Sequence, residues 1–510
     1  MARETYLLGV DVGTTGSKSV IFDLDGRLVS RGYKEYPMIM PKHTWAEQNP
    51  NDWWKATVES TKMAIRKASI ASDKIAGLGL SGQLDSPSFL DKDGIPIRPS
   101  ILWIDLRTEP QVAWVCEEIG EETVYRTTGV KVNSFYSFVK IMWIKENEPE
   151  TYERTKVILQ PKDYVGFKLT DEYFIDKALA SSSGFLDIKL GKFATDLLGE
   201  MGIPTEKLPR LVQSTDVVGN VTRKAAEATG LKEGTPVVAG SGDVMANAVG
   251  SGVLKSGLAY NKTATASDLV VCADQPIFDP KIRLVTYQHA LPGKWLLVGG
   301  TSGGVCFRWF RDNFARLEIE VAKRLDRDPY DLMDAEAGQV PPGSQNLVFL
   351  PYLAGARSPI WDPDARGVYF GIGLNHDRRH FIRAIMEGIS YSVRHRIEII
   401  EKEFALNIKE VRAVGGGARS KLWLSIMADI YRKPVVSLRG EEQECLGAAI
   451  LAGTGVGLYR DAAEASENLV TIAERSEPKT ENVERYEKLF RIYVDLYEKL
   501  RDPFEKLSQM

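Results

Sequence analysis

The fold of this chain is decided near its N-terminus, by the stretch Leu7-Leu8-Gly9-Val10-Asp11-Val12-Gly13-Thr14-Thr15-Gly16-Ser17-Lys18-Ser19-Val20-Ile21-Phe22-Asp23. An apolar run ends in an acid, a turn of Gly, Thr and Ser follows, and a second apolar run completes the pattern of a β-hairpin. In the turn, glycines let backbone N–H groups approach an oxyanion, while hydroxyls and Lys18 add donors. Asp11, at the strand end, is placed to hold a hydrated Mg²⁺ beside a phosphate. An ordinary glycine-rich hairpin is the alternative interpretation. A Walker loop and a dinucleotide fingerprint are both followed by a helix, whereas this turn is followed by a strand, so neither motif fits.

Length and composition predict two large domains. The 510 residues suffice for two buried cores, and 65 basic against 69 acidic residues leave a formal net charge of −4, which argues against a nucleic-acid binder. The four cysteines are scattered without metal-like spacing, as in reduced cytoplasmic proteins. The sequence shows neither a signal peptide nor an apolar stretch of the roughly 20 residues that a bilayer requires. We therefore expect a cytoplasmic protein that binds neither nucleic acid nor a membrane.

A short apolar strand at residues 75–83 ends in small and polar residues. Ligands of open α/β sheets bind in the crevice beyond the strand ends. The segment Leu84-Asp85-Ser86 is therefore expected to face a substrate.

Residues 101–107 carry three further candidates. If this segment is extended, its side chains alternate, which places Trp103, Asp105 and Arg107 on one face. Asp105 and Arg107 then form either a substrate-binding pair or a structural ion pair, and composition favours neither alternative.

An acid stands at the start of a predicted helix in the middle of the chain. Residues 235–240 form a strand, and Ser241-Gly242-Asp243 leads directly into a helix of small residues. A helix N-terminus stabilises a carboxylate by about 0.3–1 kcal/mol, so a simple N-cap is one interpretation of Asp243. The second interpretation is that the Asp243 carboxylate is accessible to a ligand, and it is favoured because two glycines and few bulky residues lie beside Asp243 in the sequence.

The second half of the chain repeats the plan of the first. Residues 258–271 again form a strand, a turn of small hydroxyl residues and an apolar strand. Such a duplication implies two similar domains that face each other across a cleft. Further on, Gly415-Gly416-Gly417-Ala418-Arg419-Ser420 joins a strand to a helix, a turn that suits the flat face of a nucleotide base or ribose.

Together these segments resemble the FGGY family of carbohydrate kinases, and most of all its xylulokinase branch, from residue 6 to about residue 500. Two extended signatures of the family fit. One is Phe135-x-Ser137-x-x-Lys140-Ile141-x-Trp143-Ile144-x-Glu146-Asn147, and the other combines Gly367-x-Tyr369-x-Gly371-Ile372 with His380-Phe381-x-x-Ala384-Ile385-Met386-Glu387. Each signature constrains many positions, so the two would not both fit by chance.

The resemblance implies an α/β fold of two actin-like, ribonuclease-H-like ATPase domains facing across a cleft. The N-terminal domain, residues 1–250, would hold the sugar site, the first phosphate loop and the catalytic acid. The C-terminal domain, residues 251–510, would hold the second phosphate loop and the adenosine site. ATP and Mg²⁺ would lie in the cleft, and the γ-phosphoryl group would pass to a hydroxyl of a ketose such as a pentulose, a sugar acid or a polyol.

The resemblance also implies roles for individual residues. Asp243 would be the general base, and Asp11 and Asp243 the acids beside the metal. The substrate would contact Gln83, Leu84, Asp85, Trp103, Asp105 and Asp243. ATP and its phosphates would contact Gly13, Thr14, Thr15, Ser17, Lys18, Thr265, Gly416, Gly417, Ala418 and Ser420. A homodimer is compatible with the resemblance, which does not decide the oligomeric state.

The chain departs from the family's pattern in three places. The second phosphate loop of the family reads Gly-Thr-Ser-Gly, whereas this chain has Ala264-Thr265-Ala266-Ser267, and the loss of both glycines leaves open whether ATP binding is weakened. Xylulokinases have Gln-Met-His where this chain has Gln83-Leu84-Asp85, which is closer in charge to the Gln-Arg-Glu of glycerol kinases. Ile104 and Ala356 replace polar residues common in xylulokinases. The last two departures argue against D-xylulose as the substrate.

Three classes of function follow from these observations. An ATP-dependent carbohydrate kinase is the leading hypothesis. A catalytically silent sugar or nucleotide sensor, derived from the same fold, would explain the altered loop at residues 264–267. An actin- or chaperone-like ATPase that acts on protein lacks support, because both sugar-kinase signatures are present.

Overall fold

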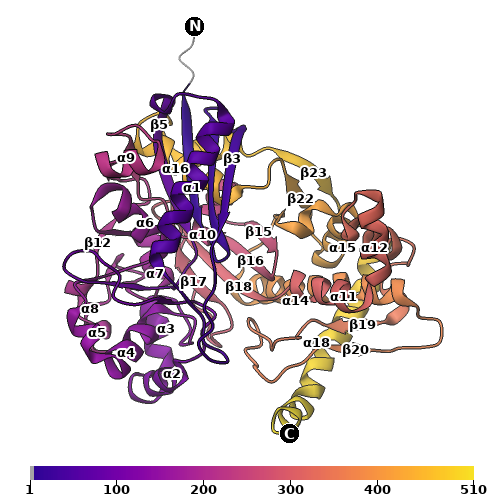
Figure 1. Cartoon of the computed structure of the whole chain (residues 1–510). Coiled ribbons are helices and arrows are strands. Elements are labelled where there is room, and N and C mark those ends of the chain that lie inside the picture. The colour runs from indigo at the N-terminus through magenta and orange to yellow at the C-terminus, as the bar shows by residue number, and fades with distance from the viewer. Residues whose placement is uncertain (1–4) are drawn as a thin grey trace. The chain divides into compact units, whose positions relative to one another are not determined.

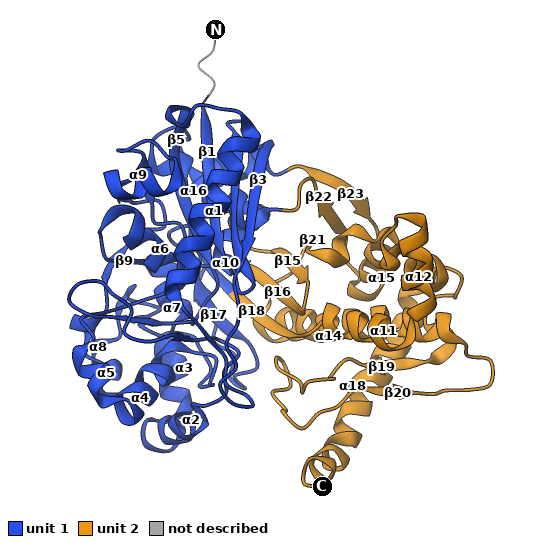
Figure 2. Cartoon of the chain, in the orientation of Figure 1, with its two compact units in different colours: residues 1–254, 274–296, 442–470 blue, residues 255–273, 297–441, 471–510 orange. Residues whose placement is uncertain are grey.

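The computed structural model describes residues 5–510, which form two compact units (Figures 1 and 2). Unit 1 comprises residues up to 254, residues 274–296 and residues 442–470, and unit 2 comprises residues 255–273, 297–441 and 471–510. The sequence predicts one boundary, at residue 250. Beyond residue 250, two further segments, residues 274–296 and residues 442–470, belong to compact unit 1.

Unit 1 is built on a six-stranded sheet. In spatial order its strands are β13 (Val217–Asn220), β14 (Pro236–Val238), β5 (Ile75–Gly82), β1 (Tyr6–Val12), β2 (Gly16–Asp23) and β3 (Leu28–Glu35). β1 pairs antiparallel with β2, with Asp11 opposite Lys18, and parallel with β5. The predicted N-terminal hairpin is therefore confirmed, and it lies inside the sheet rather than at its edge.

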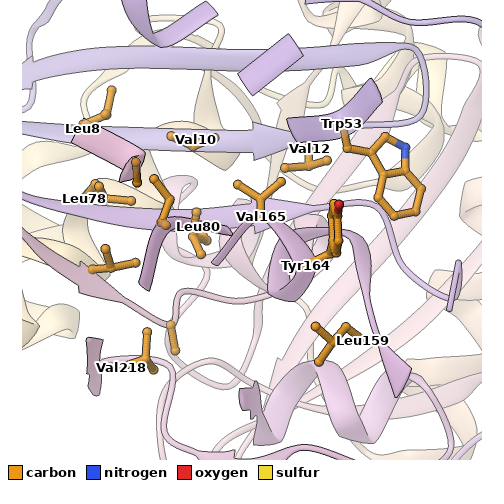
Figure 3. Packing of buried hydrophobic residues seen from close by; sticks show 14 of the residues in the cluster. Leu8, Val10, Val12, Trp53, Leu78, Leu80, Leu159, Tyr164, Val165 and Val218 are labelled. Carbon is orange, nitrogen blue, oxygen red and sulfur yellow. The ribbon is translucent and has the colours of Figure 1, made fainter. Parts of the chain in front are cut away.

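One face of this sheet is covered by α1 (Pro50–Ala68) and α6 (Pro161–Thr170). α1 begins after Asn49, whose side chain accepts a hydrogen bond from the Asn51 N–H in the first turn. Apolar side chains of β1 and β5 form one buried cluster with Trp53 of α1 and Tyr164 of α6 (Figure 3). This core holds the carboxyl ends of β1 and β5 in place.

The other face of the sheet is covered by α16 (Gln443–Gly455) at very short range. A side chain at Gly9 of β1 would lie 2.0 Å from the Cys445 carbonyl oxygen, and one at Gly79 of β5 would lie 2.0 Å from the Ala448 carbonyl oxygen. Only glycine permits so close an approach. Because α16 packs on β1 and β5, this late segment of the chain belongs to unit 1.

Unit 2 repeats the strand order of unit 1. The six strands that correspond are, in spatial order, β18 (Trp295–Ser302), β16 (Ala266–Ala273), β15 (Leu258–Thr263), β21 (Glu410–Val414), β22 (Val435–Leu438) and β23 (Ile472–Ser476). β15 and β16 form an antiparallel hairpin and β15 pairs parallel with β21, as β1 does with β2 and β5. β22 pairs antiparallel with β23, as β14 does with β13. The duplication predicted from the sequence is therefore present strand by strand.

The remaining elements connect these sheets. In unit 1 the helices are α2 (Glu109–Trp114), α3 (Glu121–Thr128), α4 (Ser137–Asn147), α5 (Pro149–Arg154), α7 (Lys177–Ser182), α8 (Thr195–Glu200), α9 (Arg223–Thr229), α10 (Asp243–Gly250) and α17 (Ala462–Leu469). Its short strands are β4 (Glu47–Gln48), β6 (Ser88–Leu90), β7 (Ser100–Ile101), β8 (Val157–Leu159), β9 (Phe174–Asp176), β10 (Leu186–Asp187), β11 (Lys192–Phe193), β12 (Arg210–Val212) and β17 (Val285–Gln288). Unit 2 adds α11 (Gly304–Phe314), α12 (Arg316–Leu325), α13 (Pro329–Ala337), α14 (Arg378–Phe404), α15 (Lys421–Tyr431), α18 (Thr480–Ser508), β19 (Val348–Leu350) and β20 (Val368–Phe370). Across residues 5–510, no helix has the length and apolar character needed to cross a membrane.

Two segments differ from their predicted conformation. Residues 102–108 turn back directly after β7 instead of continuing as a strand, because the Asp105 N–H donates to the Leu102 carbonyl. The glycine-rich residues 299–302, whose composition is typical of a turn, continue strand β18. A side chain at Gly300 would lie 1.7 Å from the Asp268 carboxylate of β16, so this glycine serves a close contact within the sheet.

Candidate functional site

The turn between β1 and β2 is closed by its own contacts. The Gly13 N–H donates to the Gly16 carbonyl over 3.1 Å, and the Tyr36 hydroxyl donates to the Gly13 carbonyl. A side chain at Gly16 would lie 2.6 Å from the Lys34 carbonyl oxygen, so the turn requires glycine there. Thr15 is exposed at the tip. The predicted phosphate loop is thus a supported turn with an accessible end.

Ser17 and Lys18 lie on opposite sides of β2. The Ser17 side chain is buried, and its hydroxyl forms a 2.8 Å hydrogen bond with that of Thr57 in α1. Side chains alternate along a strand, so Lys18 faces the other way, where its Nζ lies 2.5 Å from Glu442. This placement corrects the expectation that the Ser17 hydroxyl contacts a phosphate, because that hydroxyl belongs to the core beneath α1.

The neighbours of Lys18 keep it charged. Burial by itself lowers the pKa of a lysine, but Cys445, Asp11 and Glu442 outweigh that effect and raise the pKa of Lys18 above its usual value. Glu442 also binds Arg31 over 3.0 Å. Lys18 is therefore a cation at every physiological pH, beside the acid that ends β1.

Asp11 lies directly beneath the turn. Its Oδ1 accepts a hydrogen bond from the Ser81 hydroxyl of β5 over 2.9 Å, and a side chain at Gly13 would lie 3.4 Å from its Oδ2. Within residues 5–510 there is no group of three His, Cys, Asp or Glu side chains that could enclose a metal ion. Mg²⁺ retains several waters and needs only one or two carboxylates beside phosphate oxygens. The carboxylate chemistry here therefore fits a hydrated Mg²⁺ rather than an all-protein metal cage.

Asp243 begins α10, and its side chain is half-buried. Its Oδ1 accepts a hydrogen bond from the Val244 N–H over 2.8 Å, which keeps the carboxylate at the helix N-terminus, where negative charge is favoured. A side chain at Gly242 would lie 2.2 Å from Cδ2 of Leu84. The segment after β5 therefore lies against the residue that precedes Asp243, and these two predicted parts of the site adjoin.

A buried ion cluster supports the turn before Asp243. Lys162 Nζ lies 2.5 Å from Asp163 and 2.9 Å from Asp176, and all three side chains are 0% exposed. Asp176 accepts a hydrogen bond from the Ser241 hydroxyl over 2.7 Å. Burial raises the pKa of Asp163 to about 7, against the opposing effect of Lys162. No local pattern indicates this cluster, because Asp176 and Ser241 are distant from Lys162 along the chain.

Gln83 and Trp103 both connect to the phosphate loop. Gln83 Nε2 donates to Gln48 Oε1 over 3.0 Å, and Gln48 Nε2 donates to the Thr14 carbonyl over 2.7 Å. Trp103 Nε1 donates to the Thr14 hydroxyl over 3.0 Å, and its ring centroid lies 5.6 Å from that of Phe135. Gln48 was missed by the sequence analysis, because it stands in a polar stretch without a motif.

Asp85 is completely buried and has a left-handed backbone with a φ of 54°. Such strain in a non-glycine residue is concentrated at functional sites. Its Oδ1 accepts hydrogen bonds from the Ser137 N–H and hydroxyl, both over 2.9 Å, and Lys140 Nζ donates to its backbone carbonyl over 2.6 Å. Burial raises the pKa of Asp85 to about 7, although Lys140 and Ser137 oppose the rise, and burial lowers the pKa of Lys140. Ser137 and Lys140, both in the first of the two signatures, therefore hold the segment that follows β5.

Asp105 is buried and has both carboxylate oxygens occupied. Oδ1 accepts from the Arg107 N–H and Nε, both over 2.9 Å, and Oδ2 accepts from Arg107 Nη2 over 2.8 Å and from the Ala46 N–H over 2.6 Å. Arg107 also binds Glu47 over 2.7 Å. This geometry fits the structural ion pair, the second of the two alternatives, and leaves no oxygen of Asp105 for a substrate.

The loop at residues 264–267 turns without glycine. None of its four residues has a positive φ, and the Ala264 N–H donates to the Ala266 carbonyl over 2.9 Å. The Gly303 N–H donates to the Thr265 carbonyl over 3.2 Å, and the Thr265 side chain is exposed at the tip. The loss of both family glycines therefore does not strain this backbone.

Unit 2 contains a pocket of about 290 Å³ beside this loop. Four of the residues predicted to bind ATP line it, namely Thr265, Gly416, Gly417 and Ser420. Ala418 lies in the same turn without lining the pocket. Residues from the two halves of the predicted nucleotide site, far apart in sequence, are thus brought together within one unit.

Helices α11 and α13 complete the walls of this pocket. Phe307 stacks on Tyr330 with 5.3 Å between ring centroids and lies 5.4 Å from the Trp423 ring. Asp331 and Asp334 also line it, three residues apart on α13, and burial raises the pKa of Asp334 to about 6. Neither α11 nor α13 carries a recognisable motif, so no local pattern indicates that their residues line this pocket.

Comparison with known proteins gives matches along both units. Residues 6–250 match the N-terminal domain of the FGGY family of carbohydrate kinases, and residues 263–456 match its C-terminal domain. The chain is 33% identical to a xylulose kinase of Bacillus subtilis (strain 168), over 98% of this chain and 97% of that protein. It is 32% identical to a gluconokinase of the same organism, over 99% of this chain and 98% of that protein.

A solved structure with the same fold covers nearly the whole chain. It is the ligand-bound xylulose kinase from Lactobacillus acidophilus, with a TM-score of 0.90 and 28% identity, covering 99% of this chain and all of that one. The α/β architecture of two actin-like domains is thereby confirmed. The chain belongs to the FGGY family of carbohydrate kinases and is an ATP-dependent carbohydrate kinase.

Proposed function

We propose that this kinase transfers the γ-phosphoryl group of ATP to a hydroxyl of a small sugar or polyol, with Asp243 as the general base. The position of Asp243 carries the proposal, because a half-buried carboxylate at the start of α10 adjoins the strand end that holds Gln83 and Asp85. Phosphoryl transfer depends mainly on positioning and charge stabilisation. A carboxylate that accepts the hydroxyl proton as the bond forms makes the substrate oxygen a competent nucleophile.

The phosphate end of ATP is assigned to unit 1. Lys18 stays charged and lies beside Asp11, and the turn at residues 13–16 presents an accessible tip. Asp11 and Asp243 would supply carboxylate oxygens to Mg²⁺, which neutralises charge on the transferring phosphoryl group when it is bound. Lys18 and the backbone N–H groups of the turn stabilise the same charge from the protein side.

Removal of divalent cations tests this assignment. Activity is expected to fall to background in excess EDTA and to return on addition of Mg²⁺. Asp11→Asn removes one carboxylate and should raise the Mg²⁺ concentration for half-maximal activity by about tenfold, which corresponds to about 1.4 kcal/mol. Asp25→Asn, at an exposed turn of the same unit, is the matched control. Full activity in EDTA would contradict the role given to Asp11.

The adenosine end of ATP is assigned to the pocket of unit 2. Its aromatic wall of Phe307, Tyr330 and Trp423 suits a flat base, and the glycines of the turn after β21 allow close approach of a ribose. Asp334 and Asp331 are available to accept hydrogen bonds from ribose hydroxyls or an exocyclic amine.

Gly416→Val is the sharpest test of this pocket. No atom outside the neighbouring residues lies closer than 4.0 Å to a Cβ built at Gly416, so valine is tolerated by the fold but fills part of the pocket. We expect the KM for ATP to rise by about tenfold or more, with kcat less affected. Gly199→Val, at an exposed position of α8 with nothing within 4 Å, is the control. An unchanged KM for ATP would place the nucleotide elsewhere.

The silent-sensor alternative is separated by product formation. ADP release is measured across a panel of ketoses, polyols and sugar acids at fixed ATP. Turnover with any of them supports the kinase, as expected from the unstrained loop at residues 264–267. Measurable ATP binding without turnover on any compound would favour the sensor.

A further inference from the structure

The turn that leads into Asp243 consists of residues with little conformational restraint of their own. Gly240 and Gly242 flank Ser241, and Gly240 has a left-handed backbone with a φ of 63°. A side chain at Gly240 would lie 1.7 Å from the Leu80 carbonyl oxygen, so the turn requires glycine there. Because glycine accepts many backbone conformations, the position of Asp243 depends on contacts that hold this turn from outside.

Backbone groups of the turn are bound by two other segments of unit 1 (Figure 2). The Gly240 N–H donates to the Ser214 carbonyl over 3.0 Å. The Ala239 carbonyl accepts a hydrogen bond from Lys162 Nζ over 3.2 Å. The turn is therefore anchored through its backbone before the chain reaches Ser241.

Asp176 holds the side chain of the turn through its Oδ2 atom. This oxygen accepts hydrogen bonds from the Ser241 hydroxyl over 2.7 Å, the Ser214 hydroxyl over 3.1 Å and the Leu179 N–H over 3.2 Å. The other oxygen, Oδ1, lies 2.9 Å from Lys162 Nζ, and both side chains are 0% exposed. Asp176 therefore joins the turn to the start of α7 and to the buried cation of α6.

The charges of this cluster are costly to bury. Lys162 faces two carboxylates, those of Asp163 and Asp176, and all three side chains are 0% exposed. A buried ion pair is often no more stabilising than well-packed apolar groups of similar volume, so stability alone does not account for the cluster. A fixed carboxylate with three donors does restrict the turn to one arrangement, because each donor must meet the same oxygen.

We propose, on the basis of the proposed function in which Asp243 is the general base, that the hydrogen bond between Ser241 and Asp176 positions the Asp243 carboxylate. Ser241 and Asp176 are positioning residues in this role, because they act through Asp243. A general base acts only within hydrogen-bond reach of the proton that it accepts. A displacement of about 1 Å can lower a rate by about a hundredfold, so a turn held in one place favours proton transfer.

Two matched serine variants test this role in the whole protein. Ser241→Ala and Ser214→Ala each remove one hydroxyl donor from Asp176 Oδ2, at residues that are 0% and 3% exposed. Only Ser241 lies in the turn before Asp243, and the backbone carbonyl of the control variant still accepts the Gly240 N–H. We expect kcat to fall by about 10- to 100-fold in Ser241→Ala and to stay within about threefold of the wild type in Ser214→Ala.

Two further measurements on the same variants separate positioning from a loss of structure. The KM for ATP should stay within about twofold of the wild type in Ser241→Ala, because the variant lies outside the adenosine pocket. The two variants should lower Tm by a similar amount, because each deletes one hydrogen bond to the same oxygen. An equal fall of kcat in both variants, or a wild-type kcat in Ser241→Ala, would overturn the proposal.

The variant Asp243→Asn separates the positioning role from the proposed function. All rates are measured with the best substrate in a panel of ketoses, polyols and sugar acids at fixed ATP. If Asp243→Asn loses activity while Ser241→Ala retains the wild-type kcat, the general base stands and the positioning role is overturned. If Asp243→Asn retains the wild-type kcat, or if no compound in the panel is phosphorylated, the proposed function fails and the positioning role fails with it.

Discussion

Asp243→Asn lowers kcat by about 10²- to 10⁴-fold, the range expected when a positioned general base is lost. The amide cannot accept the proton of the substrate hydroxyl. Its oxygen can still accept the Val244 N–H, which lies 2.8 Å from Oδ1 in the wild type, so the start of α10 is retained. The KM for ATP should change by no more than about twofold, because the adenosine pocket is untouched.

The control for this variant is another aspartate in the first turn of a helix. Asp196 is exposed in the first turn of α8 and faces no predicted ligand, so Asp196→Asn should retain wild-type kcat. Thermal unfolding of both variants checks that the fold survives. A kcat for Asp243→Asn within about threefold of the wild type would remove Asp243 from the role of base.

Lys162→Met lowers the free energy of unfolding of unit 1 by about 3–5 kcal/mol, as found when one partner of a buried charge pair is removed. The substitution leaves Asp163 and Asp176 facing each other at 0% exposure without their shared cation. Methionine fills a similar volume, so the loss reports the charge rather than a cavity. Chemical denaturation followed by intrinsic fluorescence measures the change.

Two companion variants make this test specific. Lys168→Met, at a partly exposed position of the same helix, should change stability by no more than about 0.5 kcal/mol. Adding Asp163→Asn to Lys162→Met removes one uncompensated carboxylate and should recover part of the loss. A loss below about 1 kcal/mol for Lys162→Met would show that the cluster is not held by its charges.

Elements with local signals were predicted well. The N-terminal hairpin follows from two apolar runs on either side of a glycine-containing turn. The conformation of residues 102–108 was not predictable, because this sequence is compatible with both a strand and a turn. The hydrogen bond from the Asp105 N–H to the Leu102 carbonyl, which the sequence does not reveal, selects the turn. No local pattern indicates that α16, far beyond residue 250, packs onto the sheet of unit 1 at Gly9 and Gly79.

The same distinction between local patterns and distant contacts applies to the residues of the candidate site. The sequence pointed to Asp11, Lys18, Gln83, Asp85 and Asp243 because each stands at a strand end or a helix start. Their environments depend on partners far along the chain, which no local pattern encodes. Ser17 was misjudged for this reason, since its hydroxyl is taken by Thr57 of α1.

By itself, the sequence determined the two-domain kinase fold, the glycine-containing turn after β1 and the places of the acids at strand and helix ends, because these follow from motifs and patterns that neighbouring residues carry. Tertiary structure alone decided that Asp105 is bound by Arg107, that α11 and α13 wall the unit 2 pocket, and that one oxygen each of Gln83 and Asp85 is left without a donor. The physical reason is that the hydrogen-bond partners of a buried side chain come from segments that are distant in sequence. Whether a donor or acceptor has a partner is therefore decided only when those segments pack together.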